Sequence, residues 1–316
     1  MLDIRAIRDD PDAIRRRLAT RHDGSDQMID EVLSCDETRR KAETDKQQLQ
    51  SQRKKTSKEI GALRAQGEDS SAIEAEVKKI GERIKELDEE SARAEERQTE
   101  LLLTIPNLPH EACPEGEDES ANPELRTWGE KPAIAEPRDH VVLAEQHGLI
   151  SFEDGVRVAG SGFPVYRGAG ARLQRALIQY LLDVQTTRHG YQEVHVPYIV
   201  RRDCMVGTGQ LPKFEEDMYS TDKGELFLIP TAEVPVTNLY RDTILAEDDL
   251  PVKLTGHTPC WRREAGSAGR ENRGIIRVHQ FDKVELVQIV EPERSFKALE
   301  ELTGHAEAIL QSLGLH

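Results

Sequence analysis

The side chains best suited to chemistry lie on two predicted strands near the end of the chain, joined by a loop with three glycines and two arginines. Because side chains alternate along a strand, Arg262 and Glu264 are expected on one face of the first strand. On the return strand, Phe281, Lys283 and Glu285 share a face, so one face of the pair is expected to carry Arg262, Glu264, Phe281 and Glu285 together. An arginine fork binds phosphate, an aromatic ring stacks on a base, and a carboxylate accepts hydrogen bonds from an ammonium or hydroxyl group. The pattern favours a nucleotide-binding face, whereas a ladder of surface ion pairs is the alternative.

A second polar pair follows a strand predicted over residues 225–229. Thr231 and Glu233 lie two residues apart on a segment bounded by prolines. Their hydroxyl and carboxylate groups would therefore be held by a stiff stretch of backbone. The alternative is a helix cap, in which these side chains satisfy free N–H groups of a helix beginning near Val236. The sequence supports both interpretations equally.

The elements that must position these groups can be read from apolar spacing. The two site strands are predicted over residues 254–264 and 275–289, and a further strand runs over 191–196 to Pro197. An amphipathic helix precedes it, with an apolar face formed by Leu173, Ala176, Leu177, Tyr180, Leu181 and Val184. The glycines before this helix lack the third glycine of a dinucleotide-binding loop, so we expect no nucleotide there.

Composition limits the class of protein. The 316 residues include 43 Lys and Arg against 59 Asp and Glu, which gives a formal charge of −16, and only 37% are hydrophobic. No apolar run is long enough for a membrane span, and the charged N-terminus is no secretory signal. The four cysteines are far apart and form no zinc motif, so no metal site is assignable. We expect a cytoplasmic, acidic protein that could still carry a local basic patch.

The excess charge is concentrated in residues 27–103. Apolar and small residues recur there at alternating spacings of three and four, which is typical of a heptad seam: Ile73, Val77, Ile80, Ile84, Leu87, Ser91, Ala94, Gln98 and Leu101. A weaker seam precedes it, interrupted by Arg39, Lys46 and Arg53: Met28, Val32, Cys35, Ala42, Leu49, Ile60 and Leu63. A helix stop over 66–71 separates the two, so the sequence predicts an antiparallel helical hairpin.

Positive charge gathers near the tip of the first predicted helix, at Arg53, Lys54, Lys55, Lys58 and Arg64. Most helical hairpins are spacers or dimerisation elements, but a basic tip in an acidic protein suits a polyanion reached at a distance. Six prolines then mark residues 104–137 as an irregular connector, and the globular domain is expected over 138–316.

Taken in order, these segments resemble bacterial seryl-tRNA synthetase over essentially the whole chain. The resemblance rests on these motifs: Thr231-Ala232-Glu233, Trp261-Arg262-Arg263-Glu264, Gly266-Ser267-Ala268-Gly269-Arg270 and the segment from His279 to Glu285. It implies an α+β fold, with an antiparallel helical hairpin (a coiled-coil arm) followed by a class II synthetase-type antiparallel sheet flanked by helices. It also implies that residues 1–103 bind tRNA, that 138–316 form the catalytic domain, and that helix 171–188 with the strand to Pro197 forms a homodimer contact.

The resemblance implies ATP-dependent activation of L-serine to seryl-adenylate and transfer to serine tRNA, with selenocysteine tRNA as a second candidate acceptor. It assigns a catalytic pair, Arg262 and Glu264, and these serine contacts: Thr231, Ala232, Glu233 and Glu285. The implied ATP contacts are Arg262, Arg263, Glu264, Val278 and Phe281. The implied tRNA contacts are Arg53, Lys54, Lys55, Lys58, Arg64, Arg270 and Arg273.

The chain ends at His316, before the family's motif 3. That motif supplies a further arginine, the main Mg²⁺ ligands and part of the serine pocket, so we expect this chain to activate serine poorly. A catalytically silent tRNA-binding fragment or paralogue is the alternative function. A relative that loads carrier proteins is disfavoured, because such relatives lack the long arm.

Overall fold

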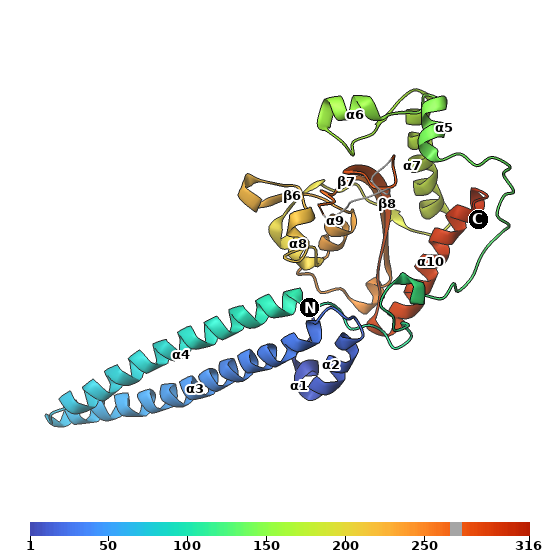
Figure 1. Ribbon diagram of the computed structural model, residues 1–316. Coiled ribbons are helices and arrows are strands. Elements are labelled where there is room, and N and C mark those ends of the chain that lie inside the picture. The colour runs from blue at the N-terminus through green and yellow to red at the C-terminus, as the bar shows by residue number, and fades with distance from the viewer. Residues whose placement is uncertain (266–273) are drawn as a thin grey trace. The chain divides into compact units, whose positions relative to one another are not determined.

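The computed structural model describes residues 1–265 and 274–316. The chain divides into two compact units, Met1–Pro123 and Glu124–His316 (Figure 1). The division falls inside the connector predicted over 104–137, where the structure has only one short 3₁₀ turn, η2 (Glu119–Ala121).

The first unit is dominated by the predicted helical hairpin. Helices α3 (Ile29–Gln66) and α4 (Ser71–Thr104) contain 38 and 34 residues and pack against each other along their length. The turn between them begins at Gly67, whose φ of 74° suits glycine. Glu68 N donates to Leu63 O over 3.0 Å, which satisfies a carbonyl at the helix end. The prediction of an antiparallel hairpin is confirmed.

The seam between the arms is apolar only in part. In α4 the residues from Ile80 to Leu101 at heptad positions are buried, whereas Ile73 and Val77 near the tip are half-buried. Polar residues at seam positions find partners across the hairpin: Lys46 Nζ lies 2.8 Å from Asp88 Oδ1, and Gln98 Nε2 donates to Val32 O over 3.3 Å. Cross-helix pairing therefore lets charged residues occupy seam positions that the sequence presented as interruptions.

The base of the arm is a small core of its own. Helices α1 (Ile4–Asp9) and α2 (Pro11–Ala19) and the turn η1 (Ser25–Met28) pack there through Ile7, Leu18 and Ile29, all fully buried. Asp36 is also almost fully buried, and Arg8 Nε lies 3.5 Å from its carboxylate.

The described part of the second unit, residues 124–265 and 274–316, contains three small sheets. The first joins β3 (Gln192–Glu193), β7 (Val252–Trp261) and β8 (Gln280–Ile289), with β7 and β8 antiparallel and β3 parallel to β7. The second is antiparallel and joins β4 (Ile199–Arg201), β6 (Leu226–Leu228) and β5 (Ser220–Thr221). The third pairs β1 (Ile150–Ser151) with β2 (Val165–Tyr166).

Helices flank these sheets (Figure 1). They are α5 (His140–Gln146), α6 (Phe152–Ala159), α7 (Ala169–Thr187), α8 (Arg202–Gly207), α9 (Glu233–Asn238) and α10 (Ser295–Ser312). Single 3₁₀ turns are η3 (Glu215–Asp217), η4 (Asp222–Gly224), η5 (Glu247–Asp249) and η7 (Pro292–Arg294). Helix α7 packs on β7 and β8, and α9 packs on β8. Within 1–265 and 274–316, no helix is long and apolar enough to cross a membrane.

Several element boundaries differ from the sequence prediction. The return strand begins at Gln280 rather than at residue 275, because Ile275 N donates to His140 Nε2 over 3.0 Å instead of pairing with β7. The strand predicted over 191–196 is reduced to β3. Helix α9 begins at Glu233 rather than near Val236, because the Thr231 hydroxyl accepts a hydrogen bond from Glu233 N over 3.1 Å.

The predicted apolar face of helix α7 is mostly left open. Val184, near the C-terminal end, is buried and Tyr180 and Leu181 are half-buried, whereas Leu173 and Leu177 are 55% and 36% exposed. The first half of this face therefore does not pack on the described part of the core. An apolar helix face that is left open in one chain is typical of a contact with a partner.

A backbone hydrogen bond joins two of the sheets where the site is built: Trp261 N donates to Ile229 O over 3.0 Å. Ile229 N in turn donates to Tyr198 O over 3.0 Å, which continues the pairing of β6 with β4. Ile229 is fully buried in a core cluster with Phe227, and Trp261 packs against the same cluster. Residues 230–233 are thereby held beside the end of β7.

Candidate functional site

A cavity of about 310 Å³ opens beside the end of β7. It is lined by Gln210, Phe214, Asp217, Met218, Pro230, Thr231, Arg262, Glu264 and Arg277. Three of the residues predicted from the sequence to bind ligand line it together, although they come from segments some thirty residues apart. They are Thr231, Arg262 and Glu264.

Arg262 lies between the cavity and an aromatic ring. Its Nε donates to Pro230 O over 3.3 Å, and its guanidinium carbon lies 5.2 Å from the centroid of the Phe281 ring. The pairing of β7 with β8 places Cys260 opposite Phe281 and thus brings the ring next to the end of β7. The predicted arginine and ring therefore meet, with a cation–π contact between them.

Glu264 reaches the cavity by a different route from the one expected. Strand β7 ends at Trp261, so the alternation of a strand does not extend to Glu264. Instead, Glu264 adopts a left-handed backbone conformation with φ of 51°, and its Oε2 accepts a hydrogen bond from Arg277 Nη1 over 2.7 Å. Sequence reasoning missed Arg277, because this residue lies outside β8 and the alternation of side chains along a strand could not place it.

A hydrogen-bonded triangle adjoins the cavity. The Thr231 hydroxyl donates to Glu285 Oε2 over 2.6 Å, Lys283 Nζ donates to Thr231 Oγ1 over 2.8 Å, and Lys283 Nζ lies 2.7 Å from Glu285 Oε2. Thr231 is 5% exposed. Because Thr231 also lines the cavity, it links this triangle to Arg262 and Glu264. The sequence had placed Lys283 on the same strand face as Glu285 without giving it a role.

Glu233 is the most electrostatically perturbed acid near the triangle. Loss of surrounding water and the neighbouring Glu285 carboxylate raise its pKa above the ordinary value for glutamate, and Lys283 opposes this shift. A large part of the Glu233 surface still faces solvent, so a polar ligand can reach it. Two carboxylates and one ammonium are thus gathered beside one hydroxyl.

Small buried residues on β7 lie opposite these groups, on the neighbouring strand. Gly256, Thr258 and Cys260 lie opposite Glu285, Lys283 and Phe281, respectively. Gly256 cannot carry a side chain, because a Cβ atom would lie 2.7 Å from Val194 O. Burial raises the pKa of the Cys260 thiol, which therefore stays protonated and is no nucleophile.

The other predicted site residues take various positions. Ala232 is fully buried and Val278 is 8% exposed, so neither presents much surface. The Arg263 side chain is exposed and does not line the cavity. Arg270 and Arg273 lie outside the described residues.

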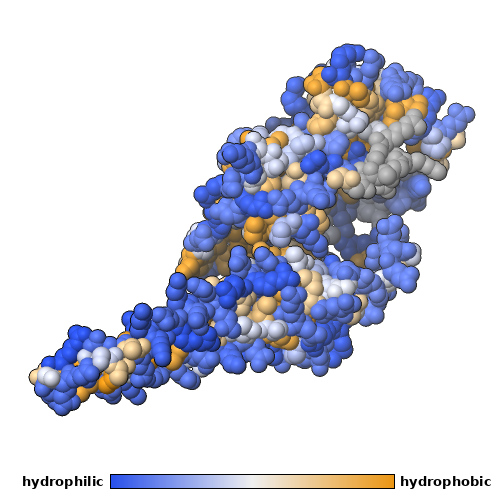
Figure 2. All heavy atoms as spheres, turned by 60° about the vertical axis from the view of Figure 1, so that its left-hand side comes forward, coloured by the Kyte–Doolittle hydropathy of each residue, from blue (hydrophilic) through white to orange (hydrophobic). Residues whose placement is uncertain are grey.

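The predicted basic cluster lies on the outer surface of the arm. Figure 2 shows that this surface is predominantly hydrophilic. Arg64 pairs with Glu74, with 2.8 Å between Nη2 and Oε1. Among the residues that the structure describes, no acidic partner pairs with the other four, which we call the basic tip: Arg53, Lys54, Lys55 and Lys58.

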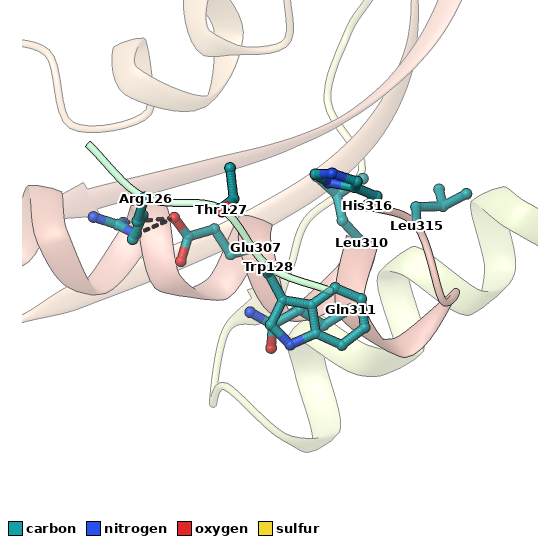
Figure 3. Close-up of a pocket in the computed structure, with 8 residues that line it drawn as sticks. All are labelled: Arg126, Thr127, Trp128, Glu307, Leu310, Gln311, Leu315 and His316. Carbon is teal, nitrogen blue, oxygen red and sulfur yellow. Dashed lines mark hydrogen bonds and ion pairs between the residues drawn. The ribbon is translucent and has the colours of Figure 1, made fainter. Parts of the chain in front are cut away.

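A second cavity, of about 390 Å³, shares no residue with this site (Figure 3). It lies at the end of α10, where Trp128 and Leu310 face it. Its arginine, Arg126, donates from Nε to Glu307 Oε1 over 2.8 Å and is therefore neutralised. This cavity offers apolar surface, and its arginine is already paired with an acid.

No metal centre can be built from the part of the chain that the structure describes. In residues 1–265 and 274–316, no three His, Cys, Asp or Glu side chains converge in a way that could hold an ion.

Comparisons with known proteins match both parts of the chain. Residues 1–109 match the family model for the seryl-tRNA synthetase N-terminal domain. Residues 213–316 match the class II tRNA synthetase core domain of the G, H, P, S and T enzymes. The two models thus cover the arm and the candidate site.

Curated relatives match along the full length of the chain. A serine–tRNA ligase of Akkermansia muciniphila is 65% identical over 316 residues, which are 100% of this chain and 74% of that protein. A serine–tRNA ligase of Methylacidiphilum infernorum is 48% identical, with 100% of this chain and 75% of that protein covered. This chain thus spans about three quarters of the length of these relatives.

Solved structures show the same fold. The seryl-tRNA synthetase of Pyrococcus horikoshii complexed with ATP superposes with a TM-score of 0.92 at 33% identity, over 98% of this chain and 74% of that one. A serine–tRNA ligase of Naegleria fowleri in complex with AMP superposes with a TM-score of 0.82 at 28% identity, over 96% and 70%. The similarity includes the arm as well as the sheets.

Proposed function

The chain belongs to the serine–tRNA ligase family, and we propose that one set of polar side chains in its site binds ATP and a second set binds L-serine. Arg262 and Glu264 would bind the nucleotide in the cavity, with Phe281 as the ring beside the base. Thr231 and Glu285 would bind serine. The observation that carries this proposal is the position of the Thr231 hydroxyl, which lines the cavity and also donates to Glu285 over 2.6 Å.

The proposed chemistry needs no protein nucleophile. A carboxylate oxygen of serine attacks the α-phosphorus of ATP and forms a bond with it. The bond between the α-phosphorus and the bridging oxygen of the β-phosphate breaks, and pyrophosphate leaves. The terminal hydroxyl of the tRNA then attacks the serine carbonyl and releases AMP. Arg262 supplies positive charge where two anionic groups must approach each other, and the site holds the reactants in place.

Serine selection follows from the triangle of Thr231, Lys283 and Glu285. A carboxylate such as Glu285 can accept hydrogen bonds from both the ammonium and the hydroxyl of serine. An amino acid without the hydroxyl, such as alanine, would leave polar groups of the site unpaired, and this penalty discriminates strongly between amino acids. Glu233, on the same side of the site, adds a second acid for the ammonium.

We propose residues 1–103 as the tRNA-binding part and 138–316 as the catalytic part, joined by the connector 104–137. The basic tip of the arm supplies four positive charges at the surface, and these suit the phosphates of a tRNA stem. The open apolar face of α7, at Leu173 and Leu177, supports a homodimer in which a second copy covers this face.

ATP would enter with Mg²⁺ on its phosphates, but we assign no described residue to the metal and no step to it. The reaction belongs in the cytoplasm, where tRNA is charged. Serine tRNA is the acceptor that the family implies.

Binding measurements on the 316-residue chain test the proposal. Calorimetry should show that ATP and L-serine bind, and that L-alanine binds far more weakly. Exchange of pyrophosphate into ATP should depend on serine. Failure of both ATP and serine to bind, with tRNA binding retained, would instead support a catalytically silent tRNA-binding protein.

A further inference from the structure

Glu264 is held in a backbone conformation that its side chain does not favour. Its φ of 51° lies in the left-handed region, which residues other than glycine rarely adopt. Such residues persist where surrounding contacts hold them, and they are common at ligand sites. The contacts that hold Glu264 should therefore control where its carboxylate points.

Asp217 provides two contacts, one on each side of Glu264. Its backbone oxygen accepts a hydrogen bond from Arg263 N over 2.8 Å, and its Oδ1 accepts one from Ala265 N over 3.0 Å. A single residue thus holds the backbone N–H groups of the residue before and the residue after the left-handed position. Asp217 is distant in sequence from Glu264 and also lines the cavity.

The segment that carries Asp217 is itself anchored. Glu215, in the same turn η3, receives two hydrogen bonds from the Arg202 guanidinium, over 2.7 and 2.8 Å. Met218, the next residue, is 7% exposed and belongs to the core cluster around Phe227. Asp217 is therefore attached to a rigid part of the second unit.

We infer that Asp217 is a positioning residue that holds Glu264 in its left-handed conformation and so keeps the Glu264 carboxylate in the nucleotide cavity, beside Arg277. This inference rests on the proposed function, since it assumes that Glu264 contacts ATP. It predicts a specific loss: without the Asp217 side chain, Ala265 N loses its acceptor, Glu264 relaxes to a common conformation, and ATP affinity falls. Serine binding, which we assign to Thr231 and Glu285, should not change.

Three variants of the chain test the inference. Asp217→Ala removes the acceptor, Asp217→Asn keeps an acceptor oxygen but not the charge, and Glu216→Ala is a matched control at an exposed neighbour. We expect Asp217→Ala to weaken ATP binding about tenfold, which is about 1.4 kcal/mol. Asp217→Asn should restore ATP affinity to within about threefold of wild type, because an amide oxygen also accepts hydrogen bonds. Calorimetry with ATP and with serine measures both affinities.

Amide hydrogen exchange gives a readout that does not depend on ligand. The Ala265 amide should exchange faster in Asp217→Ala than in wild type or in Glu216→Ala. Equal ATP affinities and equal exchange in Asp217→Ala and Glu216→Ala would overturn the inference. So would an equal loss of ATP and serine binding, or an Asp217→Asn variant as weak as Asp217→Ala. A wild-type chain that binds no ATP would overturn the proposed function instead. The exchange rate of the Ala265 amide would then show by itself whether Asp217 holds the backbone next to Glu264.

Discussion

Replacing Glu285 by glutamine removes one charge from the proposed serine site and little else. Glutamine has nearly the same shape as glutamate. The packing against the buried residues of β7 opposite this part of β8, which are Gly256, Thr258 and Cys260, is therefore kept. The Thr231 hydroxyl can still donate to the amide oxygen. What is lost is the negative charge that pairs with Lys283 over 2.7 Å and that would pair with the ammonium of serine.

The size of the effect follows from the burial of this carboxylate. The Glu285 side chain is 20% exposed, so solvent screens its interaction with an ammonium only in part. Hydrogen bonds to charged groups contribute about 1.5–3 kcal/mol net, and a value of about 2 kcal/mol is reasonable here. Serine affinity should therefore fall about 30-fold. ATP affinity should stay within about twofold of wild type, because Arg262 and Glu264 are untouched.

Calorimetric titration of the chain with serine and with ATP gives both affinities, and serine-dependent pyrophosphate exchange gives the half-saturating serine concentration. Glu301→Gln is the matched control. Glu301 also pairs with a lysine, Lys253, in the same unit, but it lies on α10 outside the site. Its substitution should leave both affinities unchanged.

Two results would contradict this reasoning. If Glu285→Gln bound serine as tightly as Glu301→Gln does, the carboxylate would not be the partner of the serine ammonium. If serine and ATP affinity fell equally, the substitution would have disturbed the whole site, and the separation into two groups would be wrong.

Three further predictions concern stability, tRNA and assembly. Glu233→Gln should raise the thermal unfolding temperature at pH 7, and the difference from wild type should vanish near pH 4. The reason is that the pKa of Glu233 is raised in the folded protein, so its ionised form destabilises the fold. This destabilisation appears as the pH rises above the pKa of the unfolded state and is complete above the pKa of the folded state. Replacing the three lysines of the basic tip by alanine should reduce the slope of log affinity for serine tRNA against log salt by about 2–3, with ATP binding unchanged. Leu177→Glu should give monomers in sedimentation velocity, whereas Leu310→Glu, at a more exposed leucine on α10, should not.

The arm could be predicted from the sequence because its structure is local. Each heptad position depends on residues three or four apart, and the stop at Gly67 is a property of one glycine. The sequence could not show that Lys46 pairs with Asp88, since that contact depends on the register between two helices. Near the tip, Ile73 and Val77 are more exposed than the seam pattern indicated.

The candidate site could be predicted only where strand alternation applies. Phe281, Lys283 and Glu285 share a face as expected, because β8 is regular throughout this stretch. Lys283 was nevertheless left without a role, since a charged residue on an open strand is usually solvated. Its contact with the Thr231 hydroxyl depends on the loop after β6 meeting β8, which no local pattern reveals.

The charges of the site explain why Lys283 belongs to it. Glu233, Glu285 and Lys283 together leave one negative charge on the serine side when both acids are ionised, which matches one ammonium group. On the nucleotide side, the cavity lining carries two acids, Asp217 and Glu264, and two arginines, so its charges sum to zero. Arg277 pairs with Glu264 over 2.7 Å, which leaves the Arg262 guanidinium as the cation for a phosphate. Lys283 lowers the pKa of Glu233, against the loss of water and the Glu285 charge that raise it, so without Lys283 the pKa of Glu233 would rise further. A neutral acid attracts the serine ammonium less. Lys283 therefore helps to keep the charge on Glu233, beside the Thr231 hydroxyl that connects the serine site to the nucleotide cavity.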